Sequence, residues 1–207
     1  MTARDGSNVL HPVIEAASRG TFPEFTQAGF ERREHMTRVG ELLRSWARAR
    51  KAGALEEARW AAAGYLHDTL RDADPDELRP LVDSRFLDYP GKVLHGPAAA
   101  QLLRKAGVVD RGLLHAIEFH TLGSPGFSRV GLALFAADFL EPGRKLREKW
   151  RARLRDRFPE AMEEGVKEIL EARLQHLLER GRPLRVETVE FWNRMTGGQG
   201  WASASEV

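Results

Sequence analysis

Apolar residues recur at three- and four-residue spacing along most of the chain, which is the period of an amphipathic α-helix. Leu42, Leu43, Trp46 and Ala49 form one such stripe. Alternation of apolar and polar residues with a period of two, the pattern of a half-buried strand, is almost absent. The sequence therefore predicts an all-α protein with helices over residues 9–18, 31–51, 54–68, 75–82, 95–106, 109–120, 128–140, 145–155, 158–180 and 185–195.

Short turn signals separate these helices. Pro75 follows Asp74 as a first-turn proline after a capping residue, and Gly107 and Gly181 stand where left-handed helix caps are expected. The chain has 207 residues, no internal repeat and no low-complexity block. We expect a single helical domain over residues 8–195, with a metal-binding core at about 30–145. Residues 1–7 and 196–207 are expected to be flexible tails.

Composition removes several classes of protein. The chain has no cysteine, which excludes disulfides, thiolate metal sites and a cysteine nucleophile. No stretch approaches the roughly 18 apolar residues of a membrane helix, and the N-terminus lacks the basic-then-apolar pattern of a signal peptide. We therefore expect a cytoplasmic protein without a membrane partner.

The formal net charge is only +2, but it is unevenly distributed. Eight cations lie between Arg144 and Arg157, opposed only by Glu148 and Asp156. Such a run is either a solvated helix face or a surface that attracts polyanions. We interpret most of this run as a solvated helix face, so nucleic acid is not an expected partner. Arg144 is the exception in the run, because it is a candidate for binding phosphate.

The adjacent pair His67-Asp68 closes an apolar, alanine-rich helix. Burying both side chains without a partner is costly, and a divalent metal is a suitable partner for a neutral imidazole beside a carboxylate. Further ligand types stand on apolar faces or at helix ends elsewhere. They are His35, His95, His120 and, inside a strongly apolar helix, Asp138.

Six nitrogen and oxygen ligands exceed the need of one tetrahedral site. They could fill one octahedral ion with open positions, or two ions bridged by Asp68. Each member also has an ordinary interpretation: a buried histidine often only packs, and Asp138 could cap a helix or pair with an arginine. Six coincident exceptions favour a metal site, with iron, manganese, zinc or cobalt suited to the ligands.

The order His…His-Asp…His…His…Asp on a helical chain resembles the HD superfamily of metal-dependent phosphohydrolases, and within it the YqeK-type symmetrical bis(5'-nucleosyl)-tetraphosphatases. The resemblance covers roughly residues 30 to 195. The segments that carry it are Glu34-His35-Met36-Thr37-Arg38-Val39, Leu66-His67-Asp68, Leu94-His95-Gly96-Pro97, Ala116 to Gly123, Ala137 to Arg144, and a late stretch from Leu177 to Asn193.

The resemblance implies an HD-domain helical bundle with additional C-terminal helices. It also implies hydrolysis of diadenosine tetraphosphate to two ADP, with iron as the metal. Four positions depart from the family pattern: Arg71 replaces a lysine, Leu122 replaces a threonine, and Met36-Thr37 replaces Thr-Leu. These departures leave the metal set intact and concern the choice of substrate.

Phosphoryl transfer needs mainly positioning and charge neutralisation, and a bound metal activates water and polarises a phosphoryl oxygen. We assign Asp68 as the shared ligand and Arg71 as the charge-stabilising group. Arg38, Arg71, Arg144, Thr121 and the turn at Gly123 are the candidate substrate-binding residues. The ordinary alternatives are a salt bridge of Arg38 to Glu34, an Arg144–Glu141 pair, and simple helix punctuation at the turn.

Two other classes of function fit the same residues. One is a different HD-type enzyme, such as a nucleoside monophosphate phosphatase or a diiron oxygenase. The other is a non-catalytic nucleotide- or RNA-binding module that keeps the metal site. The sequence fixes neither the nucleobase preference nor the oligomeric state; a homodimer is one possibility.

Overall fold

The computed structural model describes residues 9–197. In this part of the chain the ordered elements are all helical, which confirms the all-α prediction. The longer elements are α1 (Pro12–Ser18), α2 (Phe30–Ala49), α3 (Ala54–Leu66), α4 (Pro75–Leu78), α5 (His95–Lys105), α6 (Arg111–Phe119), α7 (Arg129–Leu140), α8 (Glu148–Arg157), α9 (Met162–Glu179) and α10 (Val186–Met195).

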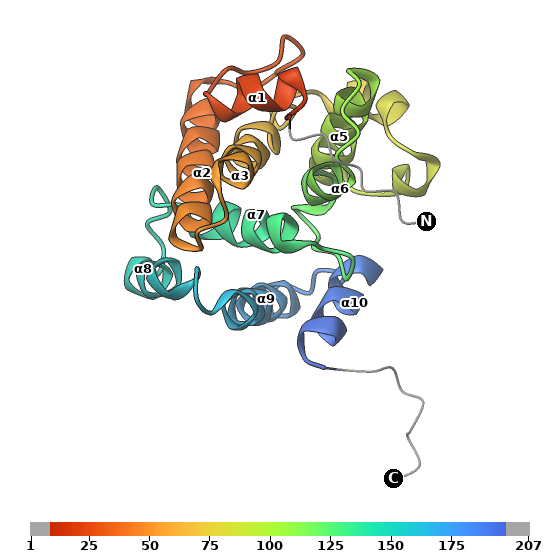
Figure 1. The fold of residues 1–207 in the computed structure, drawn as a ribbon. Helices are drawn as coiled ribbons and strands as arrows, with labels where there is room; N and C mark the ends of the chain where they lie inside the picture. Colours follow the sequence, from red (N-terminus) through yellow and green to blue (C-terminus); the bar gives the residue numbers. More distant parts are fainter. Residues whose placement is uncertain (1–8, 198–207) are drawn as a thin grey trace, which may run out of the picture.

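Helix α7 is the centre of the arrangement. Figure 1 shows it across the middle of the molecule, with α1 to α3 and the α5–α6 pair on one side and α8 to α10 on the other. It contacts α2, α3, α6, α8 and α9. Nine of its twelve residues are buried, so its sequence is apolar around its whole circumference and not along one stripe.

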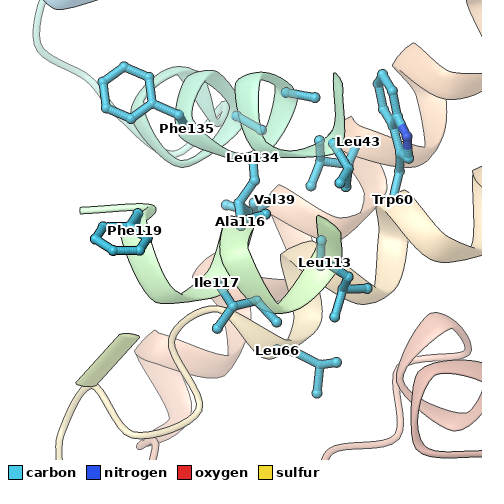
Figure 2. Packing of buried hydrophobic residues seen from close by; sticks show 14 of the residues in the cluster. Val39, Leu43, Trp60, Leu66, Leu113, Ala116, Ile117, Phe119, Leu134 and Phe135 are labelled. Carbon is cyan, nitrogen blue, oxygen red and sulfur yellow. The ribbon is translucent and has the colours of Figure 1, made fainter. Parts of the chain in front are cut away.

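The buried hydrophobic residues form one connected cluster. Ile117 of α6 and Leu66 of α3 belong to this cluster, and Leu134 points from α7 toward Val39 and Ala116 (Figure 2). Helices α2 and α3 pack closely along their length. This packing brings the ends of α2, α3, α6 and α7 together, which is the framework of the site.

Several helix boundaries differ from the sequence prediction. The helix predicted at 54–68 ends at Leu66, with His67 as its C-terminal cap. The helix predicted from 145 begins at Glu148, because Arg147 has a left-handed backbone with φ of 55°. The helix predicted from 158 begins at Met162, after a turn in which the amide of Ala161 bonds the carbonyl of Arg157.

The segment between α4 and α5 also differs. The helix predicted at 75–82 is a four-residue α4 followed by a 3₁₀ turn, Arg79–Leu81, and two further 3₁₀ turns, Ser84–Phe86 and Gly91–Val93, were not predicted. Asp74 does cap α4, since its side chain accepts from the amide of Asp76. Gly107 and Gly181 have the positive φ expected of left-handed caps.

Of the predicted tails, residues 1–7 and 198–207 lie outside the described residues, and 196–197 form a turn after α10. No helix among residues 9–197 is both long and apolar enough to cross a bilayer.

Candidate metal centre

Six residues named by the sequence lie around one buried point. Five of them are at most 5% exposed, and the sixth, Asp138, has a side chain that is 20% exposed. They are His35 in the second turn of α2, His67 at the C-terminal cap of α3, Asp68 directly after it, His95 at the start of α5, His120 at the C-terminal cap of α6 and Asp138 in the last turn of α7.

The carboxylate of Asp68 lies at the centre of this group. Its Oδ1 is 3.0 Å from Nε2 of His95 and 3.4 Å from Nε2 of His120. Its Oδ2 is 3.5 Å from Nε2 of His67 and 3.8 Å from Nε2 of His35. The two oxygens of one carboxylate therefore face two different halves of the cluster.

Asp138 completes the half that contains His35. Its Oδ1 is 3.2 Å from Nε2 of His35 and 3.9 Å from Nε2 of His67. Two overlapping groups of ligand atoms, each within 4.8 Å of one another, are thus present in the described chain: His35, His67 and Asp138, and His67, Asp68 and His120.

Backbone carbonyls fix the orientation of three imidazoles. Nδ1 of His67 lies 2.7 Å from the carbonyl of Gly64, and Nδ1 of His120 lies 2.7 Å from that of Ile117. Nδ1 of His95 lies 3.0 Å from the Lys92 carbonyl. Because a carbonyl only accepts, each Nδ1 donates, and each Nε2 keeps its lone pair toward the centre.

Two imidazole nitrogens of the cluster test whether a metal ion fits between these side chains. Nε2 of His35 and Nε2 of His67 are buried, and neither makes a hydrogen bond within the described residues. Buried polar atoms are normally satisfied, so an orphaned pair beside two carboxylates indicates an absent partner. Imidazole nitrogens and carboxylate oxygens with this arrangement can hold a divalent metal ion.

The protonation states of two histidines and of both carboxylates suit such a partner. Burial lowers the pKa of His67 to about 4 and also lowers the pKa of His95, which keeps both imidazoles neutral near pH 7. Burial alone would raise the pKa of the Asp68 and Asp138 carboxyls, but the surrounding histidines hold both well below the usual range. Neutral imidazoles and ionised carboxylates are the forms that bind metals.

A third carboxylate, Glu141, supports the cluster from behind His35. Its Oε1 is 3.4 Å from Nδ1 of His35, and its Oε2 accepts from Nε of Arg38 at 2.6 Å and from the amide of Gly143 at 2.7 Å. Arg38 therefore pairs with Glu141 and, among the ion pairs of residues 9–197, not with Glu34. Its side chain is 37% exposed and borders the site.

The other candidate substrate residues lie close to the ligands. Nη2 of Arg144 is 3.2 Å from Oδ1 of Asp138, and the side chain is 44% exposed. Arg71 is half-buried near His95, and no ion pair of Arg71 occurs in the described part of the chain. The hydroxyl of Thr121 is 3.1 Å from Nε2 of His120. Gly123 has φ of 83°, and a Cβ there would collide with the ring of Phe191, so its glycine is explained by backbone and packing.

Arg32 is a site residue that the sequence reasoning missed. Its Nη1 donates to Oδ2 of Asp68 at 2.8 Å, and its Nε lies 3.8 Å from Asp72. Arg32 precedes His35 by three residues, so both lie on one face of α2, and that spacing was the available signal. A cavity of about 420 Å³ opens here, lined among others by Arg32, Arg38 and Arg144.

Comparison with known proteins gives the family. The HD domain model matches residues 32–187. A protein of Halalkalibacterium halodurans named "Bis(5'-nucleosyl)-tetraphosphatase, symmetrical" is 27% identical over 139 residues, which are 64% of this chain and 73% of that protein. A protein of Mycoplasma genitalium named "Probable nicotinate-nucleotide adenylyltransferase/Ap4A hydrolase" is 35% identical over 124 residues, 58% of this chain. The chain spans about a third of the length of that second protein, 34%.

A solved structure is similar over most of the fold. It is titled "Crystal structure of predicted HD superfamily hydrolase involved in NAD metabolism from Clostridium acetobutylicum", and it aligns with a TM-score of 0.71 and 25% identity. The alignment covers 82% of this chain and 90% of that one. The HD domain model matches most of the length of this chain, and the His-Asp cluster is assembled in the core of the fold. The chain therefore belongs to the HD domain family.

Proposed function

We propose that the protein is a metal-dependent phosphohydrolase that cleaves diadenosine tetraphosphate symmetrically to two ADP. The observation that carries the proposal is the buried cluster centred on Asp68, with two orphaned imidazole nitrogens, next to a cavity lined by three arginines. The names of the Halalkalibacterium and Mycoplasma relatives support the choice of substrate.

The metal ligands in this proposal are His35, His67, Asp68, His95, His120 and Asp138. Asp68 serves both halves of the cluster, because its two oxygens face different histidines. A bound divalent ion would supply activation of water and polarisation of a phosphoryl oxygen. We expect iron, one or two ions, because the resemblance to the HD-type phosphohydrolases implies it; the imidazole and carboxylate ligands themselves suit iron, manganese, cobalt and zinc alike.

The arginines would bind and neutralise the phosphate chain. Arg71 has no ion pair among the described residues, and its charge is near enough to His95 to help lower the pKa of that imidazole, so its guanidinium is available to a phosphate. Arg144 is partly exposed at the edge of the cluster and can pair with phosphate oxygens. Thr121 adds a hydroxyl donor beside His120. Arg38 and Arg32 line the adjoining cavity together with Glu31, Glu34 and Glu141, so its lining is of mixed charge and the two guanidiniums are its phosphate-binding groups.

The test is metal analysis of the purified protein followed by a substrate panel. We expect one or two equivalents of a transition metal, and ADP as the only nucleotide released from diadenosine tetraphosphate. Release of AMP and ATP would contradict symmetrical cleavage. Faster turnover of nucleoside monophosphates, or oxygen-dependent turnover of another substrate, would replace the proposal with one of the other HD-type activities.

The same proposal places the protein in the cytoplasm, where nucleotide substrates are present, with a nucleotide and neither nucleic acid nor membrane as its partner. Fractionation tests the location. Light scattering of the purified protein tests whether it forms a homodimer.

A further inference from the structure

A second cavity adjoins the metal centre on the side away from α2. It has a volume of about 470 Å³ and lies between the end of α7, the start of α8 and α9. Asp138 and Arg144 form its inner end, and both also border the metal cluster. Figure 1 shows α8 and α9 on the opposite side of α7 from α2.

The lining of this cavity combines an aromatic ring with positive charge. Trp150 is half-buried, and its ring meets Phe139 edge-to-face with centroids 5.9 Å apart. The guanidinium of Arg147 lies 5.9 Å from the centroid of the Trp150 ring, at the outer limit of a cation–π contact. Arg173 lines the far wall, where it donates to the carbonyl of Thr121 at 2.5 Å.

This combination matches a nucleotide better than an apolar ligand. An indole provides a stacking surface for any base, and arginines bind the phosphates that follow it. Four arginines line the cavity, against the carboxylates of Asp138 and Glu179. The volume falls in the range of about 300–1,000 Å³ that small-molecule sites occupy.

The cavity beside α2 forms the counterpart. Its volume is about 420 Å³, and its lining combines an aromatic ring, Phe30, which is 79% exposed, with Arg32 and Arg38 and with three glutamates. Arg144 lines both cavities. A substrate with two nucleosides and a central phosphate chain needs a site on each side of the metals, and the shared Arg144 is then placed to bind that chain.

We propose that the groove between α7, α8 and α9 binds one nucleoside of the dinucleoside tetraphosphate, with its base on Trp150 and its nearest phosphate on Arg147. The cavity beside α2 receives the other nucleoside. This assignment rests on the proposed function, because only a substrate with two nucleosides fills both sides.

The test compares two nucleotides on the metal-loaded protein. One is a methylene-bridged diadenosine tetraphosphate that resists hydrolysis, and the other is adenosine 5'-tetraphosphate, which has a single nucleoside. Calorimetry measures the binding of both to the wild type and to Trp150→Ala, Trp150→Phe and Arg147→Ala. Arg153→Ala is the matched control, because Arg153 lies on the same helix, is 62% exposed and pairs with Glu168 outside the groove.

We expect Trp150→Ala to weaken binding of the two-nucleoside analogue about tenfold or more, because one base loses its stacking partner. Binding of adenosine 5'-tetraphosphate to Trp150→Ala should weaken less than about threefold, because its nucleoside can occupy the cavity beside α2. Trp150→Phe should retain most of the affinity for the analogue. Arg147→Ala should weaken binding of the analogue, and Arg153→Ala should leave it unchanged. In steady-state kinetics the loss in Trp150→Ala should appear in KM and not in kcat.

Two results would overturn the assignment: binding of the analogue that is unchanged in both Trp150→Ala and Arg147→Ala, or an equal loss of binding for the two nucleotides in Trp150→Ala. Arg147→Ala keeps the test decisive if Trp150→Ala is unstable. Failure of the proposed function gives a different result, because the wild type would then not release ADP from diadenosine tetraphosphate. Selective loss of analogue binding in Trp150→Ala would still support the groove as a nucleotide site.

Discussion

The contact between α2 and α3 is the feature of the fold on which the metal centre most directly depends. Gly64 and Gly40 face each other there, and a Cβ added at Gly64 would lie 2.5 Å from both Cα and N of Gly40 and 2.9 Å from the carbonyl carbon of Val39. All three atoms belong to the backbone, so no rotamer change can relieve the overlap. We predict that Gly64→Ala forces the two helices apart by about 1 Å.

Two effects of opposite sign set the magnitude. Alanine stabilises a helix by about 1 kcal/mol relative to glycine. Overpacking of a close-packed interior costs about 1–3 kcal/mol, occasionally more, and a backbone-to-backbone overlap belongs at or above the upper end. We expect a net loss of about 2 kcal/mol in the free energy of unfolding. For a chain of this size the midpoint of thermal unfolding should fall by roughly 4–8 °C.

The same change should weaken the metal site. The carbonyl of Gly64 accepts from Nδ1 of His67, so a shift of α3 moves that imidazole away from His35 on α2. Thermal and urea unfolding measure the stability, and elemental analysis measures the metal content. Gly112→Ala in α6 is the control, because the nearest atom there is the end of the Arg59 side chain, which can move. If Gly64→Ala is as stable as this control, or more stable than the wild type, the steric argument is refuted.

The remaining predictions concern single side chains. Asp68→Ala should lose metal and activity together, and full metal occupancy by elemental analysis would show that its role is wrong. Arg71→Ala should keep its metal but lose kcat/KM on diadenosine tetraphosphate at every pH, with Arg71→Lys retaining much of the activity; a change within about twofold for Arg71→Ala would reject a phosphate role. Glu141→Gln should lower metal affinity by about 10–100-fold, measured by metal titration, because this carboxylate orients His35. Asp110→Asn should lower the free energy of unfolding near neutral pH, because Arg59 pairs with Asp110 and, although burial opposes it, holds the pKa of this carboxyl below its usual value. The difference in stability from the wild type should disappear as the pH falls through that lowered pKa. A difference in stability that persists in acid would show that the charge of Asp110 is not the cause.

Local features of the sequence determined the elements and the chemistry of the ligands. The apolar period of three to four residues gave the all-α fold, and Asp74, Gly107 and Gly181 marked helix ends because caps depend on one residue and its immediate neighbours. His67-Asp68 at a helix end identified the centre of the site. Where local cues were weak the prediction failed, as in the 3₁₀ turns between residues 79 and 93 and the turn before α9.

Only the tertiary structure decided which side chains meet. Arg32 bonds Asp68 across 36 residues, and Arg38 bonds Glu141 across 103, and neither partner follows from helix spacing. The two cavities that share Arg144 also depend on how α2, α8 and α9 are placed around α7. The physical reason is that capping and amphipathic period act over a few residues, whereas the pairing of charges and the shape of a site depend on how the helices pack against one another.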